Sequence, residues 1–218
     1  MPNRIIAIGD IHGCSRALDS LLDRIEPESS DTVVTLGDYI DRGPDTPAVV
    51  ERLLKLENQC NLVSLIGNHE VMMLTALEQP SEIHFWLQCG GEPTVEAYGG
   101  DLSAIPVSHL DFLKNCRPFH ETDDHFFVHA NYVADLPLKR QPHFTMLWEH
   151  LSHHRPGPHL SDKIGVVGHT PQVNGEILDL GHLLCIDTYC YGGGWLTALD
   201  ITSGNYWQAN NVGELRIE

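Results

Sequence analysis

The stretch that decides the fold is TVVTLGDYIDRG, residues 32–43, because it joins an apolar run to a loop rich in charge. Residues 32–36 are β-branched or leucine, which is typical of a buried strand. The loop that follows places two carboxylates and one guanidinium between Gly37 and Gly43. A simple turn needs glycine, asparagine or proline rather than charges of both signs. We therefore expect this loop to carry chemistry.

The same order of strand, polar loop and helix occurs twice more in the first third of the chain. RIIAI (4–8) precedes GDIHG and the helical pattern SRALDSLLDRI, and NLVSLI (61–66) precedes GNHE and VMMLTALE. Repeated units of this kind predict parallel strands joined by helical crossovers. The nearly continuous apolar residues of the strands predict helices or a second layer on both faces of the sheet.

The predicted secondary structure changes twice in the rest of the chain. Residues 79–118 contain SEIHFWLQ, a Gly-Gly pair and VSHLDFLKNC, which predicts short helices inserted over the site. From about residue 125 the chain is β-rich, and SGN at 203–205 predicts a hairpin between the last two strands. The segment 150–160, rich in proline, glycine and histidine, predicts an exposed loop with His153, His154 and His159 in solvent. We expect one α/β domain over residues 1–218.

Composition excludes some partners. The 218 residues carry a formal charge of −17, which disfavours binding to nucleic acid or to anionic membranes. No apolar run approaches the roughly 20 residues of a membrane span, and the N-terminus lacks the pattern of a signal peptide. The six cysteines are scattered without a C-x-x-C pair, so we expect reduced thiols and a cytoplasmic location.

Polar side chains follow five of the predicted strands. A glycine precedes a ligand-type residue at four strand exits, and a histidine ends a fifth. Because ligand sites in open α/β sheets lie beyond the carboxyl ends of the strands, we expect these side chains to share one centre. The six candidate metal ligands are Asp10, His12, Asp38, Asn68, His129 and His169.

The donor atoms of this set are oxygen and imidazole nitrogen, which suit manganese, iron, zinc or cobalt. Six donors exceed the needs of one four-coordinate ion and fit two ions that share a carboxylate. Two such ions can activate water and hold phosphoryl oxygens. Taken singly, Asn68 is equally typical of a helix N-cap, His129 of a buried core histidine, and Arg42 of a solvated loop arginine.

The five motifs GDIHG, GDYIDRG, GNHE, VHA and VGHT occur in this order over residues 9–170. In this set and order they resemble the calcineurin-like metallophosphoesterases. Within that superfamily the chain is most similar to the bacterial and phage PPP-type serine/threonine phosphatases, with the symmetrical diadenosine tetraphosphate hydrolases as near relatives. The resemblance implies a four-layer α-β-β-α sandwich with mixed sheets.

The resemblance also implies roles for the metal ligands. Asp10 and His12 would bind a first metal ion, and Asp38 would bridge it to a second. Asn68, His129 and His169 would complete the second site, and Asn68 would also contact substrate. Manganese is the ion expected at both positions.

The resemblance further implies that His69 is the general acid, oriented by Asp41, and that Arg42 holds a phosphate oxygen. The residues themselves support the first role, because a histidine can protonate a basic alkoxide and a carboxylate partner fixes its tautomer. Asp187, at another strand exit, is interpreted as a supporting or structural residue.

Two positions depart from the family pattern. Ile66 stands where many PPP-type phosphatases have an arginine before GNHE, and His150 in LWEH stands where bacterial members have a later arginine. Neither side chain can copy the bidentate guanidinium fork. We therefore treat His150 as a candidate substrate-binding residue and consider Arg117, Arg140 and Arg155 as other sources of positive charge.

The function implied first is hydrolysis of phosphomonoesters, above all phosphoserine and phosphothreonine in proteins. A hydroxide bridging the two ions would attack phosphorus in line, without a phosphoenzyme. Small phosphoesters are also expected substrates. The alternatives are cleavage of phosphoanhydrides in dinucleotides, suggested by Ile66, and a metal-binding scaffold without turnover.

Overall fold

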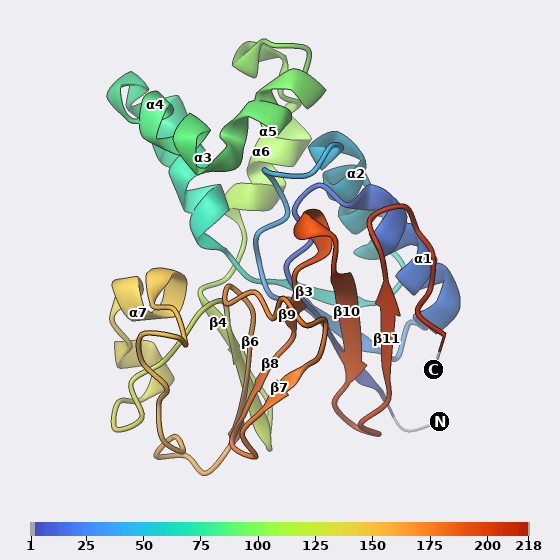
Figure 1. The fold of residues 1–218 in the computed structure, drawn as a ribbon, viewed down its shortest axis with the longest axis vertical. Coiled ribbons are helices and arrows are strands. Elements are labelled where there is room, and N and C mark those ends of the chain that lie inside the picture. Colours follow the sequence, from blue (N-terminus) through green and yellow to red (C-terminus); the bar gives the residue numbers. More distant parts are fainter. Residues whose placement is uncertain (1–2, 218) are drawn as a thin grey trace.

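Two mixed β-sheets lie face to face between helices in the computed structural model, which describes residues 3–217 (Figure 1). The first sheet has the order β11-β10-β1-β2-β3, with β9 paired to β10, and the second has the order β4-β5-β6-β8-β7. The strands of the first sheet are β1 (Ile5–Ile8), β2 (Thr32–Thr35), β3 (Asn61–Ser64), β9 (Asp187–Thr188), β10 (Trp195–Asp200) and β11 (Tyr206–Ala209). Those of the second are β4 (Phe119–Glu121), β5 (His125–Val128), β6 (Ile164–Val167), β7 (Leu178–Asp179) and β8 (Leu183–Cys185).

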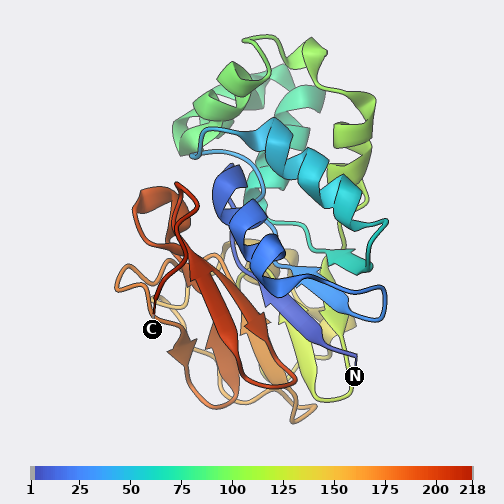
Figure 2. The same cartoon turned by 90° about the vertical axis from the view of Figure 1, so that its right-hand side faces the viewer.

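The three repeated units at the N-terminus form the parallel half of the first sheet, as predicted. β1 pairs with β2, and β2 with β3, in parallel register. The chain then returns to this sheet at its C-terminus, where β10 pairs antiparallel with β1 (Figure 2). The predicted hairpin is β10–β11, whose strands are antiparallel. The second sheet is built from β5, β6 and β8 in parallel, with antiparallel strands at its two edges.

The interior between the sheets explains the continuous apolar strands. Alternate residues of a strand point to opposite faces. Ala7 of β1 therefore contacts the opposite sheet, whereas Ile6 and Ile8 pack under the helices. In β5, Phe127 lies between the sheets, and Phe126 packs on the outer face. Strands that are buried on both faces need no polar alternation, which confirms the prediction from their composition.

The helical layers are unequal, so the four-layer architecture is confirmed with a thin outer layer on the second sheet. The helices are α1 (Ser15–Ile25), α2 (Thr46–Leu56), α3 (Asn68–Glu78), α4 (Ile83–Trp86), α5 (Glu92–Ala97), α6 (Val107–Lys114) and α7 (His143–Trp148). α1 and α2 lie against the first sheet, and α3 to α6 rise beyond the strand ends (Figure 1). The second sheet is covered by the short α7 and neighbouring loops. We call residues 80–114 the helical cap.

One expectation about the loop at 150–160 is wrong. His153 and His154 are exposed, as predicted, but His159 is only 3% exposed. Its Nε2 lies 2.9 Å from the carbonyl oxygen of Leu136, and its ring packs against Phe126 and Tyr132. The loop folds back over the second sheet, where no long helix covers the strands, and its last histidine completes the outer layer.

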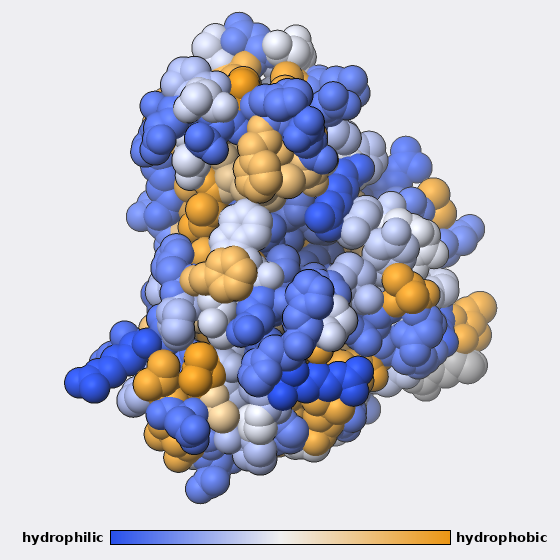
Figure 3. Space-filling model, turned by 60° about the vertical axis from the view of Figure 1, so that its left-hand side comes forward, coloured by the Kyte–Doolittle hydropathy of each residue, from blue (hydrophilic) through white to orange (hydrophobic). Residues whose placement is uncertain are grey.

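The surface is mainly hydrophilic on the face shown in Figure 3, with hydrophobic residues in separate spots. Among the large apolar side chains that are well exposed are Phe85 of α4 and Phe144 of α7. Within residues 3–217, no helix combines the length and the apolar character that crossing a bilayer requires.

Candidate active site

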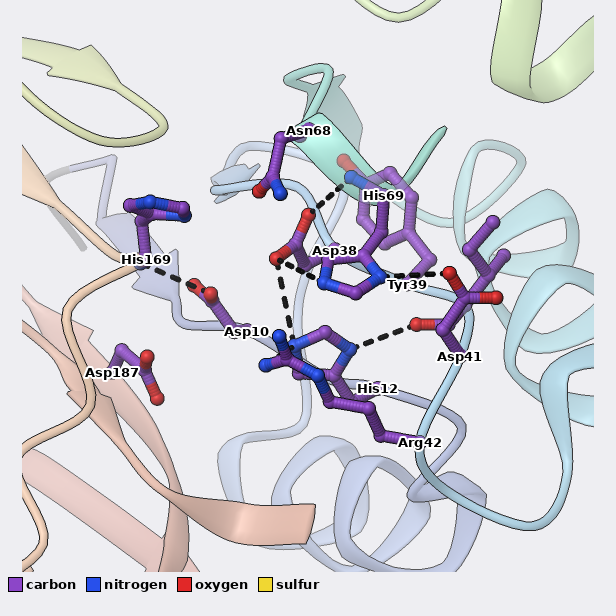
Figure 4. A network of polar contacts seen from close by, with 12 residues as sticks. Asp10, His12, Asp38, Tyr39, Asp41, Arg42, Asn68, His69, His169 and Asp187 are labelled. Carbon is purple, nitrogen blue, oxygen red and sulfur yellow. Dashed lines mark hydrogen bonds and ion pairs between the residues drawn. The ribbon is translucent and has the colours of Figure 1, made fainter. Parts of the chain in front are cut away.

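The loops that leave β1, β2, β3, β5 and β6 converge at one end of the two sheets (Figure 4). Five of the six predicted metal ligands lie on these loops and the sixth begins α3, and all are buried or nearly so. Asp10, His12 and Asp38 come from the first sheet, and His129 and His169 come from the second. Asn68 is the first residue of α3. Side chains far apart in the sequence are thus brought together because parallel strands end at the same edge.

Asp38 occupies the centre of this cluster. Its Oδ2 lies 3.5 Å from Nε2 of His12, and its Oδ1 lies 3.5 Å from Nε2 of His129. Nε2 of His129 in turn lies 3.0 Å from Oδ1 of Asn68 and 3.2 Å from Nδ1 of His169. Two groups of donor atoms therefore share the carboxylate of Asp38, one with His12 and His69 and the other with His129 and His169. Asp10 belongs to neither group, and its Oδ2 accepts a hydrogen bond from the N–H of His169 at 3.0 Å.

The histidines present the tautomer that a metal ligand requires. Nδ1 of His12 lies 2.8 Å from the carbonyl oxygen of Ile40, and Nδ1 of His129 lies 2.8 Å from that of Leu36. A carbonyl oxygen only accepts, so each Nδ1 carries the proton and each Nε2 is left unprotonated, with its lone pair directed into the cluster. Metal-binding histidines in proteins are oriented in the same way by a second hydrogen bond.

The charge of the cluster also fits divalent cations. Asp10 is 3% exposed, and its Oδ1 has no hydrogen-bond partner among residues 3–217. Burial, helped by the charges of Asp187 and Asp38, raises the pKa of Asp10 well above its usual value. Burial likewise raises the pKa of Asp187 to about 7. Three buried carboxylates lie near the single guanidinium of Arg42, and this excess negative charge is costly unless cations offset it.

The imidazoles of the cluster stay neutral at neutral pH. Burial lowers the pKa values of His12 and His129, and it lowers that of His169 to about 3. Neutral imidazole is the form that binds metal. The pKa of Asp38 is also lowered, but here burial is not the cause. Burial acts to raise its pKa, but the surrounding histidines, His129 above all, bring it below the usual range.

The backbone of the site is strained at the residues that carry its chemistry. Outside glycine, positive φ angles are uncommon and cost about 1–3 kcal/mol each. Six of the eight such residues in the described chain border the site, namely His12, Asp38, Asp41, Arg42, His169 and Tyr189. The loops therefore hold conformations that the surrounding structure imposes.

Glu70 is one of the groups that impose this geometry, and the sequence reading missed it. Its Oε2 accepts hydrogen bonds from the N–H groups of Asp38 and Gly67, at 2.8 and 2.9 Å. Its Oε1 accepts one from the N–H of Tyr39 at 2.8 Å. The helix N-cap is Gly67 rather than Asn68, and Glu70 stands at the third helical position, where a capping glutamate is common. A glutamate at the third position of a predicted helix was the feature of the sequence that could have indicated this role.

His69 and Asp41 form the predicted pair. Nδ1 of His69 lies 2.7 Å from Oδ2 of Asp41, and Nε2 of His69 lies 4.0 Å from Oδ2 of Asp38. The ring therefore spans from Asp41 to the centre of the cluster (Figure 4). Burial acts to lower the pKa of His69, but the charge of Asp38 and the bond to Asp41 outweigh burial and raise it.

Positive charge in the site comes from Arg42. Its Nη1 lies 3.2 Å from Nε2 of His12, and its guanidinium lies 4.7 Å from the ring centre of Tyr191. His150 lies at the rim, half-buried, with its ring 5.9 Å from that of His169. The other candidate cations, Arg117, Arg140 and Arg155, are exposed, and no contact joins them to the cluster in the described part of the chain.

Comparison with known proteins agrees with this geometry. The family model for calcineurin-like phosphoesterases matches residues 3–198. A serine/threonine-protein phosphatase 1 of Salmonella typhimurium is 32% identical over 87% of this chain and 88% of its own length. A symmetrical bis(5'-nucleosyl)-tetraphosphatase of Nitrosomonas europaea is 30% identical, but the match covers 62% of this chain and 47% of that protein.

Solved structures share the fold. One provisionally assigned to a diadenosine tetraphosphatase has a TM-score of 0.72 at 22% identity and covers 96% of this chain and 94% of that one. A Saccharomyces cerevisiae serine/threonine phosphatase has a TM-score of 0.65 at 17% identity, covering 100% of this chain and 79% of that one. The motifs, the two-sheet fold, the cluster around Asp38 and these matches together show that the chain belongs to the calcineurin-like phosphoesterase family.

Proposed function

We propose that the protein is a dinuclear metal-dependent phosphomonoesterase that removes phosphate from serine and threonine side chains of proteins. The observation that carries this proposal is the pair of donor groups that share Asp38, one of which includes the acid candidate His69. The substrate class is supported by the Salmonella relative, whose match extends over most of both chains. The six free thiols support a reducing compartment, which we take to be the cytoplasm.

Two groups of residues would hold the metal ions. The first is Asp10, His12 and Asp38, and the second is Asp38, Asn68, His129 and His169. When bound, two divalent ions supply a water of lowered pKa and Lewis-acid contacts to phosphoryl oxygens. Oxygen and imidazole donors suit manganese, which we propose as the ion, and also suit iron, zinc and cobalt.

Arg42 would orient the phosphoryl group. Its guanidinium is planar and can bond two phosphate oxygens at once. The ring of Tyr191 lies against one face of the guanidinium and limits its movement. Asn68 lies across Asp38 from Arg42, beside His129, and would add a substrate contact. His150, at the rim beside His169, would contact the remainder of the substrate.

His69 would protonate the leaving oxygen. Because Asp41 accepts from Nδ1, the second ring nitrogen faces the centre of the cluster and is the one that can deliver a proton. An alkoxide leaving from serine is strongly basic and needs that proton, whereas p-nitrophenolate does not. General acid catalysis is worth about 10²–10⁴-fold.

A comparison of leaving groups tests this role. We expect His69→Asn to lower kcat on a phosphoserine peptide by about 10²-fold or more, and to lower it far less on p-nitrophenyl phosphate. The exposed His153→Asn serves as the matched control and should leave both rates unchanged. Equal losses on the two substrates would remove His69 from the acid role. The metal role is checked by Asp38→Asn, which should abolish manganese binding in titration calorimetry.

A second candidate function is hydrolysis of symmetrical dinucleoside tetraphosphates. The Nitrosomonas relative favours it, as does Ile66, which leaves the site with one arginine where protein phosphatases have more. Measuring kcat/KM on diadenosine tetraphosphate and on a phosphopeptide, side by side at saturating manganese, separates the two. A preference for the dinucleotide would replace the protein-phosphatase assignment, and turnover of neither substrate would leave only a metal-binding scaffold.

A further inference from the structure

Residues 85–94 of the helical cap, FWLQCGGEPT, contact the part of the candidate active site that holds the pair His69 and Asp41. The segment runs from the end of α4 through a kink in Leu87–Gly91, where the backbone of Gly90 is not helical, into α5. Three residues of the segment contact Asp41 or Arg42, although more than forty positions separate them in sequence.

The carboxylate of Asp41 accepts a hydrogen bond from the cap at each of its oxygens. Nε1–H of Trp86 donates to Oδ2 at 2.8 Å, and the hydroxyl of Thr94 donates to Oδ1 at 2.8 Å. The same Oδ2 lies 2.7 Å from Nδ1 of His69. All three partners are almost completely buried, so water cannot replace a lost bond without a rearrangement of the site.

The hydroxyl of Thr94 has a single proton and can donate to one partner at a time. Its oxygen accepts from the N–H of Asp41 at 2.8 Å and lies 3.1 Å from the hydroxyl of Thr46. When Thr46 donates to that oxygen, the proton of Thr94 points to the carboxylate. Indole nitrogen is also a donor only. Burial raises the pKa of Asp41, and the two cap donors act against it, which favours an ionised Asp41 and a proton on Nδ1 of His69.

The two glycines fix how close the cap approaches. The carbonyl oxygen of Gly90 accepts from the N–H of Arg42 at 2.9 Å. Gly90 has φ +112°, and a Cβ there would come within 2.8 Å of Cγ of Arg42. A Cβ on Gly91 would come within 2.6 Å of the ring of Trp86. A larger residue at Gly90 would push the cap away from the loop that carries Asp41 and Arg42, and one at Gly91 would displace the ring of Trp86.

We propose that Trp86 and Thr94 are positioning residues of the cap, which hold Asp41 so that His69 directs its second ring nitrogen at the leaving group. This inference rests on the proposed function, since it assigns the support of the acid in that reaction. The consequence is specific: without the cap donors, Asp41 can rotate, and the ring of His69 loses its fixed direction. Neither Trp86 nor Thr94 makes a hydrogen bond to a proposed metal ligand within residues 3–217, so the ligands should keep their places.

The test compares an alkyl and an aryl phosphate. Removing a supporting hydrogen bond in sites of this kind typically costs about 10–100-fold. We expect Thr94→Val to lower kcat on a phosphoserine peptide by about ten-fold, with little change on p-nitrophenyl phosphate and an unchanged KM. Thr94→Ser retains the hydroxyl and should restore the peptide rate. Trp86→Phe, which keeps the ring against Gly91, should behave as Thr94→Val does.

The control is a variant that weakens the cap without touching Asp41. The hydroxyl of Tyr98 lies 2.7 Å from Nδ1 of His109 inside the cap, and Tyr98→Phe removes that bond. It should lower the melting temperature and leave the ratio of peptide to aryl rates unchanged. Thr94→Val with an unchanged ratio, or with equal losses on both substrates that Thr94→Ser does not restore, would overturn the proposal.

Failure of the proposed function would look different. If the wild-type protein turned over neither substrate, or if His69→Asn had no effect on the peptide rate, the acid itself would be wrong. If His69→Asn lowered the peptide rate and the Thr94 variants did not, only the inference about the cap would fall. Manganese affinity measured by calorimetry should be equal in wild type and Thr94→Val, and a large loss would show that the cap acts on the metal cluster instead.

Discussion

Replacing Asp10 with asparagine should change the stability of the protein in opposite directions with and without metal. In the metal-free protein, Oδ1 of Asp10 is buried without a partner within residues 3–217, near the carboxylates of Asp187 and Asp38. Burying a charge near other carboxylates is costly. Asparagine leaves a polar atom at this place but carries no charge, so Asp10→Asn should stabilise the metal-free protein even though a proposed ligand is lost.

The size of each effect can be worked out. For a chain of 218 residues, each kcal/mol corresponds to about 2–4 °C in melting temperature. With manganese at about 100 times its dissociation constant, the wild type gains about 2.7 kcal/mol. A variant that binds about 100-fold more weakly gains only about 0.4 kcal/mol at the same concentration. Asp10→Asn should thus melt higher in EDTA and respond far less to manganese.

The pH dependence has a definite sign. Since the pKa of Asp10 is raised on folding, the folded protein binds more protons than the unfolded chain, and its stability falls as the pH rises above about 4. Asp187, with a pKa of about 7, extends this loss to about pH 7. Asp10→Asn should make the slope shallower in the metal-free protein.

The assay is thermal unfolding in EDTA and in manganese, from pH 4 to pH 8, with the exposed Asp23→Asn as the matched control. Asp23→Asn should follow the wild type under both conditions. A lower melting temperature for Asp10→Asn in EDTA would refute the argument from the unpaired carboxylate. An undiminished manganese response would refute the assignment of Asp10 as a ligand.

Three further variants test other parts of the structure. Tyr191→Leu removes the ring beside Arg42 and should raise KM for a phosphate monoester by about 2–5-fold in steady-state kinetics. Tyr191→Phe keeps the ring and should leave KM unchanged. Asp31 is buried, and burial acts to raise its pKa, but the bond from Arg4 and backbone N–H donors lower it overall. Asp31→Asn should therefore cost about 1–2 kcal/mol in urea unfolding at pH 7, and the difference should vanish as the pH falls through the lowered pKa, because the wild type then loses the same interaction. Phe127→Ala, between the two sheets, should cost about 3–5 kcal/mol in the same assay.

The arrangement of the cluster could be predicted because it follows from topology. Parallel strands end at one edge, so the loops after β1, β2 and β3 had to deliver Asp10, Asp38 and Asn68 to the same place. His129 and His169 come from the second sheet, and no pairing rule relates two sheets that only pack face to face. Their place beside Asp38 was predicted because they follow strands too, and the resemblance of the motifs supported it, but strand pairing did not require it.

The supporting residues could not be predicted in this way. Trp86 and Thr94 lie on short helices whose direction depends on tertiary packing, so no periodicity in the sequence relates them to Asp41. Burial of His159 was missed because a histidine between glycine, proline and serine is typical of solvent-exposed loops. It is buried because the second sheet has so little helix to cover it.

The antiparallel strand β10 has a consequence for the protein during its synthesis and after proteolysis. β1, which leads into Asp10, is flanked on one side by β2 and on the other by a strand made from residues near the C-terminus. Until that last hairpin is synthesised or if it is clipped by a protease, one side of β1 stays open to any passing polypeptide. Forms of this protein that lack the hairpin should therefore self-associate through the exposed edge of β1.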